Sequence, residues 1–183
     1  MVYAYLAYTG QRPQSTTDKL TFEDFEKALR IDLPTLRVFG VKAKEFLHRI
    51  PIHPVVVEWL KPVIEFKNLI NAKDNDPVFP YNSLRIVLID LDIKVHHTGM
   101  RIQPSHFRKF FEQMCNNVLM AHPGLRDYIM AHNTGSLDVQ SYDGKLPSEI
   151  YHQYMEKWGR VNLVPEGVSL RKLINHLCSQ NLS

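Results

Sequence analysis

The spacing of large apolar residues between positions 107 and 118 constrains the fold of this chain more than any other feature. Phe107 is followed at +3, +4, +7 and +11 by Phe110, Phe111, Met114 and Val118. An α-helix has 3.6 residues per turn, so this spacing places all five side chains on one helix face. A helix with such an apolar face needs a hydrophobic core to cover it. The segment therefore predicts a globular domain built from packed helices.

Helical signals recur along most of the remaining chain. Thr21 and Asp24 have the spacing of a capping box, and His53-Pro54 opens a helix that Pro62 is expected to kink or break. Other helices are expected over residues 1–8, 125–130 and 169–178. A further helix is expected to begin at a cap at 82 or 83, with an inner face of Leu84, Val87, Leu88 and Leu91. Another is expected to run from a cap at Ser148 to Trp158.

One interval has a different pattern. Leu36-Arg37-Val38-Phe39, a turn at Gly40 and Phe46-Leu47-His48-Arg49-Ile50 predict an antiparallel β-hairpin within residues 36–52, with lysines at its tip. The sequence therefore predicts a mainly α-helical domain with a small antiparallel β-hairpin, an α+β fold.

Size and composition exclude several classes of protein. A length of 183 residues suits one domain, and 44% hydrophobic with 22% charged residues is typical of a globular chain. Two cysteines exclude a disulfide-rich scaffold and a multi-cysteine zinc site. The sequence contains no apolar stretch of the length a membrane span needs, and we expect a soluble, cytoplasmic protein. A net charge of +3 permits a polyanionic partner without requiring one.

Four short segments concentrate residue types that act on phosphates. They are Thr9-Gly10-Gln11-Arg12, the hairpin tip with Lys42 and Lys44, Ser105-His106-Phe107-Arg108, and the stretch from His132 to Tyr142. Taken singly, such residues are more often exposed or structural than functional. Their order along the chain makes them informative.

In this order the segments resemble the catalytic domain of the tyrosine recombinases, also called phage integrases, and most closely the divergent integrases of archaeal viruses and plasmids. Thr9-Gly10-Gln11-Arg12 matches the family's Thr-Gly-x-Arg, and Lys44, or alternatively Lys42, matches its hairpin lysine. The segment from Asp76 to Pro80 is similar to a D-x-V-F motif of the family. Arg108 matches the second arginine motif, His-x-x-Arg, and Met130-Ala131-His132 loosely matches Leu-Gly-His. The family's nucleophilic tyrosine follows that histidine by about nine residues, and Tyr142 follows it by ten. Because Tyr142 lies in a polar stretch, we expect it to be partly exposed, whereas Tyr128, on a helix face beside Ile129, is expected to be a core residue.

The chain departs from the family pattern at two positions. Ser105 stands where the family has the histidine of His-x-x-Arg, and the adjacent His106 lies about 100° further round the helix. Ser15 stands where the family has an acidic residue. The resemblance covers residues 1–158 and implies a catalytic domain that lacks the family's N-terminal DNA-clamping part. Residues 159–183 form a C-terminal extension that is expected to be helical.

The resemblance implies a phosphodiester exchange on DNA. Tyr142 would attack a backbone phosphate, form a 3′-phosphotyrosyl link and release a 5′-hydroxyl. The covalent link conserves the energy of the phosphodiester bond, so rejoining needs no ATP. Arg12 and Arg108 would bind the phosphate oxygens, because the guanidinium fork fits them bidentately. Lys44 would protonate the leaving oxygen, and His132 would donate to the phosphate or move a proton. No cofactor and no metal is implied.

The expected partners are double-stranded DNA and further copies of this chain, as a tetramer on DNA in a nucleoid-associated setting. The first alternative is a decayed integrase fragment that binds DNA without catalysis, since both departures fall on site positions. A type IB topoisomerase shares the chemistry but not the surrounding sequence. A metal-binding protein is a third class, suggested by His96-His97, although neighbouring histidines point in different directions and no further ligands cluster with them.

Overall fold

The computed structural model describes residues 2–16, 19–39, 46–67, 69–79, 81–132, 142 and 144–163. Within these residues the chain is mainly helical with one two-stranded antiparallel sheet, which confirms the predicted fold class. The elements in chain order are α1 (Val2–Thr9), α2 (Pro13–Thr16), α3 (Phe22–Leu29), β1 (Thr35–Phe39), β2 (Phe46–Pro51), α4 (Pro54–Phe66), α5 (Tyr81–Asp90), α6 (Pro104–Gln113), the π-helical turn η1 (Met114–Val118), α7 (Pro123–Ile129) and α9 (Pro147–Trp158).

Local sequence signals explain several element ends. Thr21 and Asp24 form the predicted capping box in front of α3, and the His53 ring accepts a hydrogen bond from the Val55 N–H at the start of α4. In the sheet, Leu36 lies opposite Ile50 and sends its side chain into the core. These ends depend on contacts a few residues apart, so the sequence predicts them well.

Two predicted helix starts were wrong, and one predicted break is absent. α4 continues through Pro62 to Phe66, so the proline, which was expected to kink or break the helix, does not break it. α5 begins at Tyr81, so neither Asn82 nor Ser83 is its cap. α9 begins at Pro147, because a proline is favoured in the first turn of a helix, and Ser148 lies inside it. The inner face predicted for α5 is also only half right: Leu84 and Leu88 are buried, whereas Val87 and Leu91 are exposed.

The long apolar helix predicted for residues 107–118 is interrupted by a change of helical register. α6 ends at Gln113 and continues as η1, where the Leu119 N–H donates to the carbonyl of Met114 five residues earlier. A π-turn adds a residue to the helical turn, so the side chains beyond it are rotated away from the original apolar face. Phe111, before the turn, is buried, whereas Val118, at the end of the turn, is 64% exposed, so the predicted apolar face does not continue to Val118.

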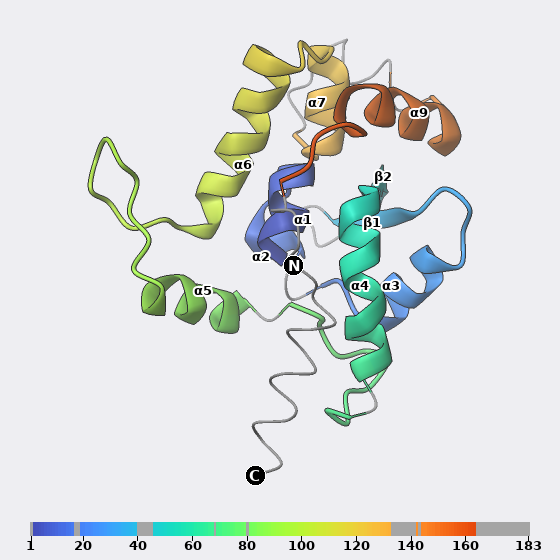
Figure 1. Ribbon diagram of the computed structural model, residues 1–183. Coiled ribbons are helices and arrows are strands. Elements are labelled where there is room, and N and C mark those ends of the chain that lie inside the picture. The colour runs from blue at the N-terminus through green and yellow to red at the C-terminus, as the bar shows by residue number, and fades with distance from the viewer. Residues whose placement is uncertain are drawn as a thin grey trace.

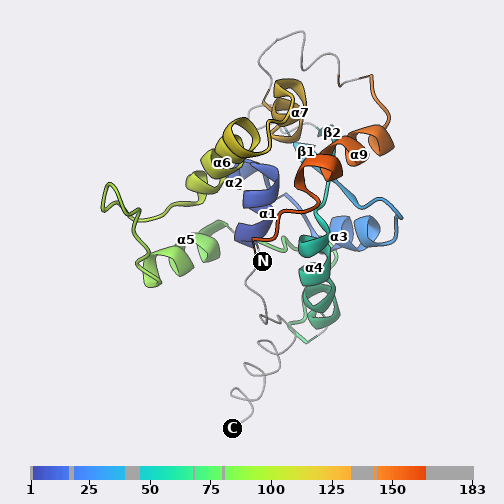
Figure 2. The same cartoon turned by 45° about the horizontal axis from the view of Figure 1, so that its top comes forward.

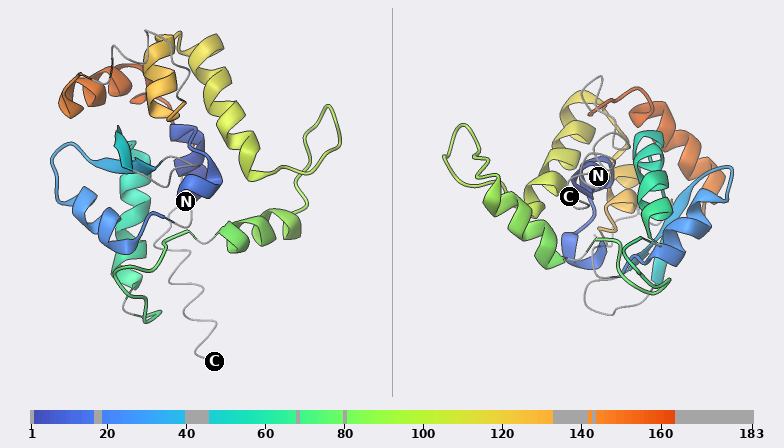
Figure 3. Two further views of the ribbon diagram at one scale, coloured as in Figure 1. Left: turned by 180° about the vertical axis from the view of Figure 1, so that it is seen from behind. Right: turned by 60° about the horizontal axis from the view of Figure 1, so that its bottom comes forward.

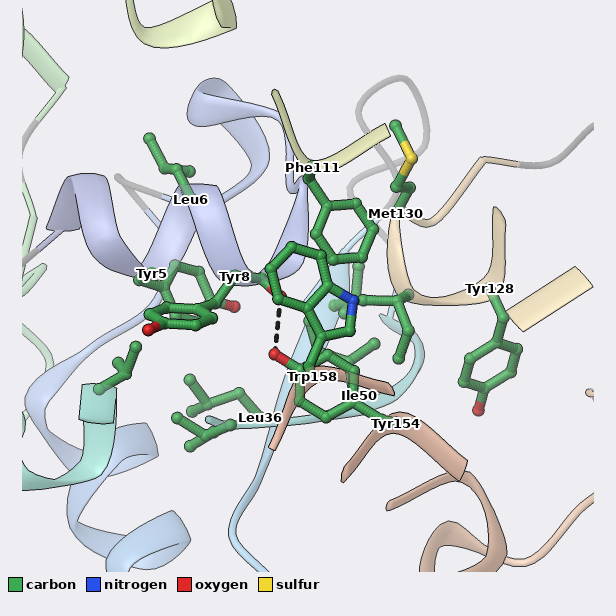
Figure 4. Close-up of a cluster of buried hydrophobic side chains, with 14 of the residues drawn as sticks. Tyr5, Leu6, Tyr8, Leu36, Ile50, Phe111, Tyr128, Met130, Tyr154 and Trp158 are labelled. Atoms are coloured by element: carbon green, nitrogen blue, oxygen red, sulfur yellow. Dashed lines mark hydrogen bonds between the residues drawn. The ribbon is translucent and has the colours of Figure 1, made fainter. Parts of the chain in front are cut away.

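The core lies where α1, α6, α9 and the sheet meet (Figure 4). The Trp158 ring stacks on Phe111 with their centroids 4.8 Å apart, and the Tyr154 hydroxyl donates to the Tyr8 carbonyl at 2.8 Å. Each fully buried side chain of this size contributes about 1.5–3 kcal/mol by removing apolar surface from water. Helix α9, the last of the described helices, and α1, the first, therefore share one core.

α1 occupies the middle of the molecule. α6, α7 and α9 lie on one side of it, at the top of Figure 1, while the hairpin, α3 and α4 lie on another (Figures 1 and 2). α5 and the segment leading to α6 project from the rest of the molecule, as the rear view in Figure 3 also shows. Residues that follow α1 are therefore placed within reach of both α6 and α7.

The chain remains part of the core beyond Trp158, the predicted limit of the catalytic domain. The Tyr8 hydroxyl donates to the Val161 carbonyl at 2.9 Å and accepts from the Leu163 N–H at 2.9 Å. Residues 159–163 are thus tied to α1. The helix predicted over residues 169–178 lies outside the described residues.

Candidate functional site

Gly10 is the point at which three segments of the chain meet. Its φ is +60°, which ends α1 in the left-handed region. A Cβ atom at this position would lie 2.5 Å from Cδ1 of Phe111 in α6 and 2.9 Å from Cγ of Met130 after α7. Only glycine fits such an approach. Gly10 therefore ends α1 and is also a packing contact between helices.

Of the other residues in Thr9-Gly10-Gln11-Arg12, two are buried and hydrogen-bonded to the backbone, and one is exposed. The buried Thr9 hydroxyl donates to the Tyr5 carbonyl at 2.7 Å, and the buried Gln11 amide donates to the Ile129 carbonyl at the end of α7. Arg12 is exposed. Three residues of the motif therefore fix the backbone, and the fourth lies at the surface.

Arg108 links the same three segments from α6. Its Nη1 donates to the Gly10 carbonyl at 2.6 Å and to the Met130 carbonyl at 2.8 Å. Because both partners are backbone carbonyls, they orient the guanidinium without neutralising its charge. Both hydrogen bonds that Arg108 makes within the described residues use Nη1, which leaves Nε and Nη2 available to a ligand.

The electrostatic environment of Arg108 is unfavourable for a cation. Burial, and after it the positive charge of Arg12, together lower its pKa to about 10, against the opposing effect of Glu112 and Asp127. Two arginines held near one another, one of them partly buried, raise the free energy of the site until an anion binds. An oxyanion with several acceptor atoms, such as a phosphate, fits this arrangement.

His132 follows the end of α7, and a Schellman motif fixes its backbone. The His132 N–H donates to the Asp127 carbonyl at 2.8 Å, and the Ala131 N–H donates to the Tyr128 carbonyl at 3.0 Å. Ala131 has the left-handed φ of 49° that this motif requires. The imidazole is half exposed, with its Nδ1 3.8 Å from Oδ1 of Asp127.

A pair of charged residues on α7 completes the surroundings. Arg126 Nε donates to Oδ1 of Asp127 at 2.8 Å, and Arg126 Nη1 donates to the side chain of Asn116 at 2.7 Å. The Asp127 carboxylate raises the pKa of Arg126 through this hydrogen bond, although partial burial opposes the shift. Sequence inspection missed Arg126, Asp127 and Gln11. An Arg-Asp pair five residues before a candidate histidine was the signal that could have drawn attention to the pair.

His106 does not take the place that Ser105 leaves. Its Nδ1 accepts from the Gln103 N–H at 3.1 Å and caps the start of α6. Its side chain also lines an open apolar cavity of about 650 Å³ together with Tyr3, Trp59 and Ile102. Ser105 itself is exposed. His106 therefore serves as a helix cap. It lies on a different side of α6 from the arginine junction, the point at which Arg108 bonds the carbonyls of Gly10 and Met130.

Tyr142 is buried, contrary to the expectation of partial exposure. Its side chain is 5% exposed, and its ring lies 6.2 Å from that of Tyr128 and 5.9 Å from that of His122. The Nζ of Lys145 lies 4.4 Å from its centroid. The polar sequence around Tyr142 suggested exposure, but contact with rings carried by α7 and its cap overrides that local preference. Tyr128 is buried, as predicted.

Three of the five predicted site residues lie on the segments that meet here. Arg108 bonds the carbonyls of Gly10 and Met130, Arg12 and His132 each follow one of these two residues by two positions, and Tyr142 packs against α7. Lys44 and its alternative Lys42 lie outside the described residues. Within the described part of the chain, no three His, Cys, Asp or Glu side chains gather closely enough to hold a metal ion. Among the same residues, no helix has the length and apolar character needed to cross a membrane.

Comparison with protein-family models, curated proteins and solved structures finds no significant match to this chain.

Proposed function

We propose that this protein is a site-specific DNA recombinase of the tyrosine-recombinase type, which cuts and rejoins DNA through a 3′-phosphotyrosyl intermediate. The observation that carries the proposal is the arginine junction, where Arg108 is oriented by two carbonyls and repelled by Arg12. Such a pair of cations is costly without a ligand and suits the oxygens of a DNA phosphate. The order and spacing of the motifs support the same proposal.

In this proposal the arginines stabilise the charge that develops on the phosphate. Nε and Nη2 of Arg108 and the fork of Arg12 would each bind a non-bridging oxygen. A preorganised donor of this kind is worth about 3 kcal/mol, which corresponds to about a hundredfold in rate. His132 would donate to the same phosphate, and Lys44 would protonate the 5′-oxygen as it leaves.

Tyr142 would supply the nucleophile, and it must leave its buried position to do so. A tyrosine hydroxyl with an ordinary pKa near 10 is a weak nucleophile at neutral pH, so it reacts only beside cations that stabilise the phenolate. In this proposal, packing against Tyr128 and His122 holds the tyrosine in its buried position until DNA binds. A tetramer on DNA, with one phosphate bound in each copy, would then exchange strands.

The second candidate is a DNA-binding module without catalysis, and the burial of Tyr142 favours it. In that case the arginine junction would bind a backbone phosphate, and the tyrosine would serve only to pack against α7. The absence of the family's histidine at Ser105 points the same way. The two candidates differ in whether a covalent bond to DNA ever forms.

A nicked suicide duplex distinguishes them, because loss of a short 5′-hydroxyl strand traps the covalent intermediate. We expect the wild-type protein to form a denaturation-resistant protein–DNA adduct that Tyr142→Phe abolishes. Tyr151→Phe is the matched control, since Tyr151 lies on α9 near the core. A gel shift without adduct would establish the binding module, and an adduct that persists in Tyr142→Phe would show that another residue attacks.

A further inference from the structure

Asp127 is a buried carboxylate that the proposed chemistry does not use. Its side chain is 8% exposed, and acidic residues are rarely buried unless they are paired. One of its oxygens, Oδ1, accepts from Arg126 Nε at 2.8 Å and lies 3.8 Å from Nδ1 of His132. Its charge also acts on Arg108. Asp127 is thus the acidic centre of a group of site cations.

The backbone holds the Asp127 and His132 side chains close together. The Schellman motif bonds the His132 N–H to the Asp127 carbonyl, so both side chains start from the same point at the end of α7. This contact needs no residue beyond 132. The histidine is therefore kept beside the carboxylate whatever path the following chain takes.

An acidic partner at one imidazole nitrogen decides what the other nitrogen does. With Nδ1–H directed at a carboxylate, Nε2 is left free to face a ligand and the ring orientation is fixed. Among the described residues, the charge of Asp127 acts on Arg126 and Arg108; Glu112 also acts on both, and Arg12 acts on Arg108. Within the same residues, Asp127 is the acid that lies within reach of the His132 ring.

We propose that Asp127 is the positioning residue of this site: its buried carboxylate holds the Nδ1 side of His132 and directs Nε2 toward the bound phosphate. The catalytic part of this inference rests on the proposed function, whereas the orientation of the ring does not. The acidic residue that the family pattern places at position 15 is replaced here by Ser15. Asp127 supplies a carboxylate to the site from a different element.

Asp24 offers a matched control within the same chain. Its side chain is 5% exposed and accepts from Arg37 Nε at 2.9 Å, so it is also a buried carboxylate bonded to an arginine. It caps α3, and among the described residues its carboxylate bonds Thr21 and Arg37 rather than a histidine. Asp24→Asn therefore measures the cost of neutralising such a pair without touching His132.

The first measurement uses the DNA-free protein. Ring ¹⁵N chemical shifts of the neutral His132 side chain should show the Nδ1–H tautomer in the wild type and a shift toward Nε2–H in Asp127→Asn. Asp24→Asn should leave the His132 signals unchanged. An Nε2–H tautomer in the wild type would overturn the proposal even if every variant failed to fold.

The second measurement is the rate of adduct formation on the suicide duplex. We expect Asp127→Asn to lower it about tenfold with DNA affinity retained, Asp127→Glu to restore most of it, and Asp24→Asn to leave it unchanged. In a His132→Ala background, Asp127→Asn should cause no further loss, because Asp127 acts through the ring. A wild-type rate in Asp127→Asn, or a full further loss in that background, would refute the role.

Failure of the two proposals can be told apart. If the wild-type protein forms no adduct but the His132 tautomer depends on Asp127, the recombinase proposal fails and the positioning of His132 stands. If the adduct forms and the tautomer is indifferent to Asp127→Asn, the recombinase proposal stands and the positioning fails.

Discussion

The arginine junction and the surroundings of Tyr142 are built in opposite ways. At the junction, Arg108 is fixed by two carbonyls, and Gly10 packs tightly against Phe111 and Met130, so the Arg108 guanidinium is in place before any ligand arrives. Tyr142 is held by ring contacts and by one lysine above its ring. The junction therefore holds Arg108 in place, whereas Tyr142, the nucleophile that we propose, would have to leave its packed position to react.

The largest effect is expected at the centre of the rigid region. Gly10→Ala adds a Cβ atom that meets Phe111 and takes a left-handed φ, which together should cost about 2–4 kcal/mol of folding free energy. Urea unfolding followed by Trp158 fluorescence measures the loss. Gly144→Ala is the control, because nothing lies within 4 Å of a Cβ placed there. Equal losses in the two variants would show that the junction is not tightly packed.

The second prediction concerns the charge at that junction. Pyrophosphate at a hundred times its Kd should stabilise the wild-type protein by about 2.7 kcal/mol, since a ligand bound only to the folded state stabilises it. Arg108→Met should lose most of this gain, because the anion then lacks its oriented partner. Lys109→Met changes an exposed neighbour and should keep the gain. The measurement is the thermal unfolding midpoint with and without pyrophosphate, and similar gains in both variants would argue against the site.

The third prediction addresses the displaceable region. Lys145→Met removes the cation above Tyr142, an interaction worth about 0.5–1 kcal/mol. The more exposed state of Tyr142 should then be populated about two- to fivefold more. Nitration of Tyr142, quantified by mass spectrometry, reports this change. Lys61→Met on the exposed side of α4 should leave nitration unchanged, and no increase in Lys145→Met would mean that contacts other than Lys145 retain the tyrosine.

The smallest effect is expected at Ala131. Its φ of 49° suits glycine, so Ala131→Gly should relieve about 1 kcal/mol of strain and lose part of that to the greater freedom of the unfolded chain. A net gain of about 0.5 kcal/mol is expected in urea unfolding. Ala28→Gly within α3 should instead destabilise by about 1 kcal/mol. A loss at Ala131 would contradict the strain assigned to the Schellman motif.

The parts of the fold that the sequence predicted are those set by neighbouring residues. The cap at Thr21, the start of α4 at Pro54 and the hairpin pairing depend on short-range patterns. The π-turn after α6 and the exposed face of α5 depend on which surfaces other elements cover. Periodicity alone could not reveal them.

The candidate site also has parts that the sequence indicates and parts that depend on packing between distant residues. Motif order singled out Arg12, Arg108 and His132, and the structure places them on the segments that meet at Gly10 and Met130. Asp127 was missed because its relation to His132 arises from a left-handed residue between them, which an alanine at 131 does not signal. The burial of Tyr142 depends on rings more than ten residues away along the chain.

The hydroxyl of Tyr8, which binds Val161 and Leu163, has a practical consequence for anyone who re-engineers this protein. A truncation after Trp158 would remove both partners and loosen the helix that leads to Arg12. An affinity tag, a fluorescent reporter or a fused DNA-targeting module should therefore be joined after Leu163. A fusion joined before Leu163 would remove these hydrogen bonds and so disturb α1, at the other end of the sequence.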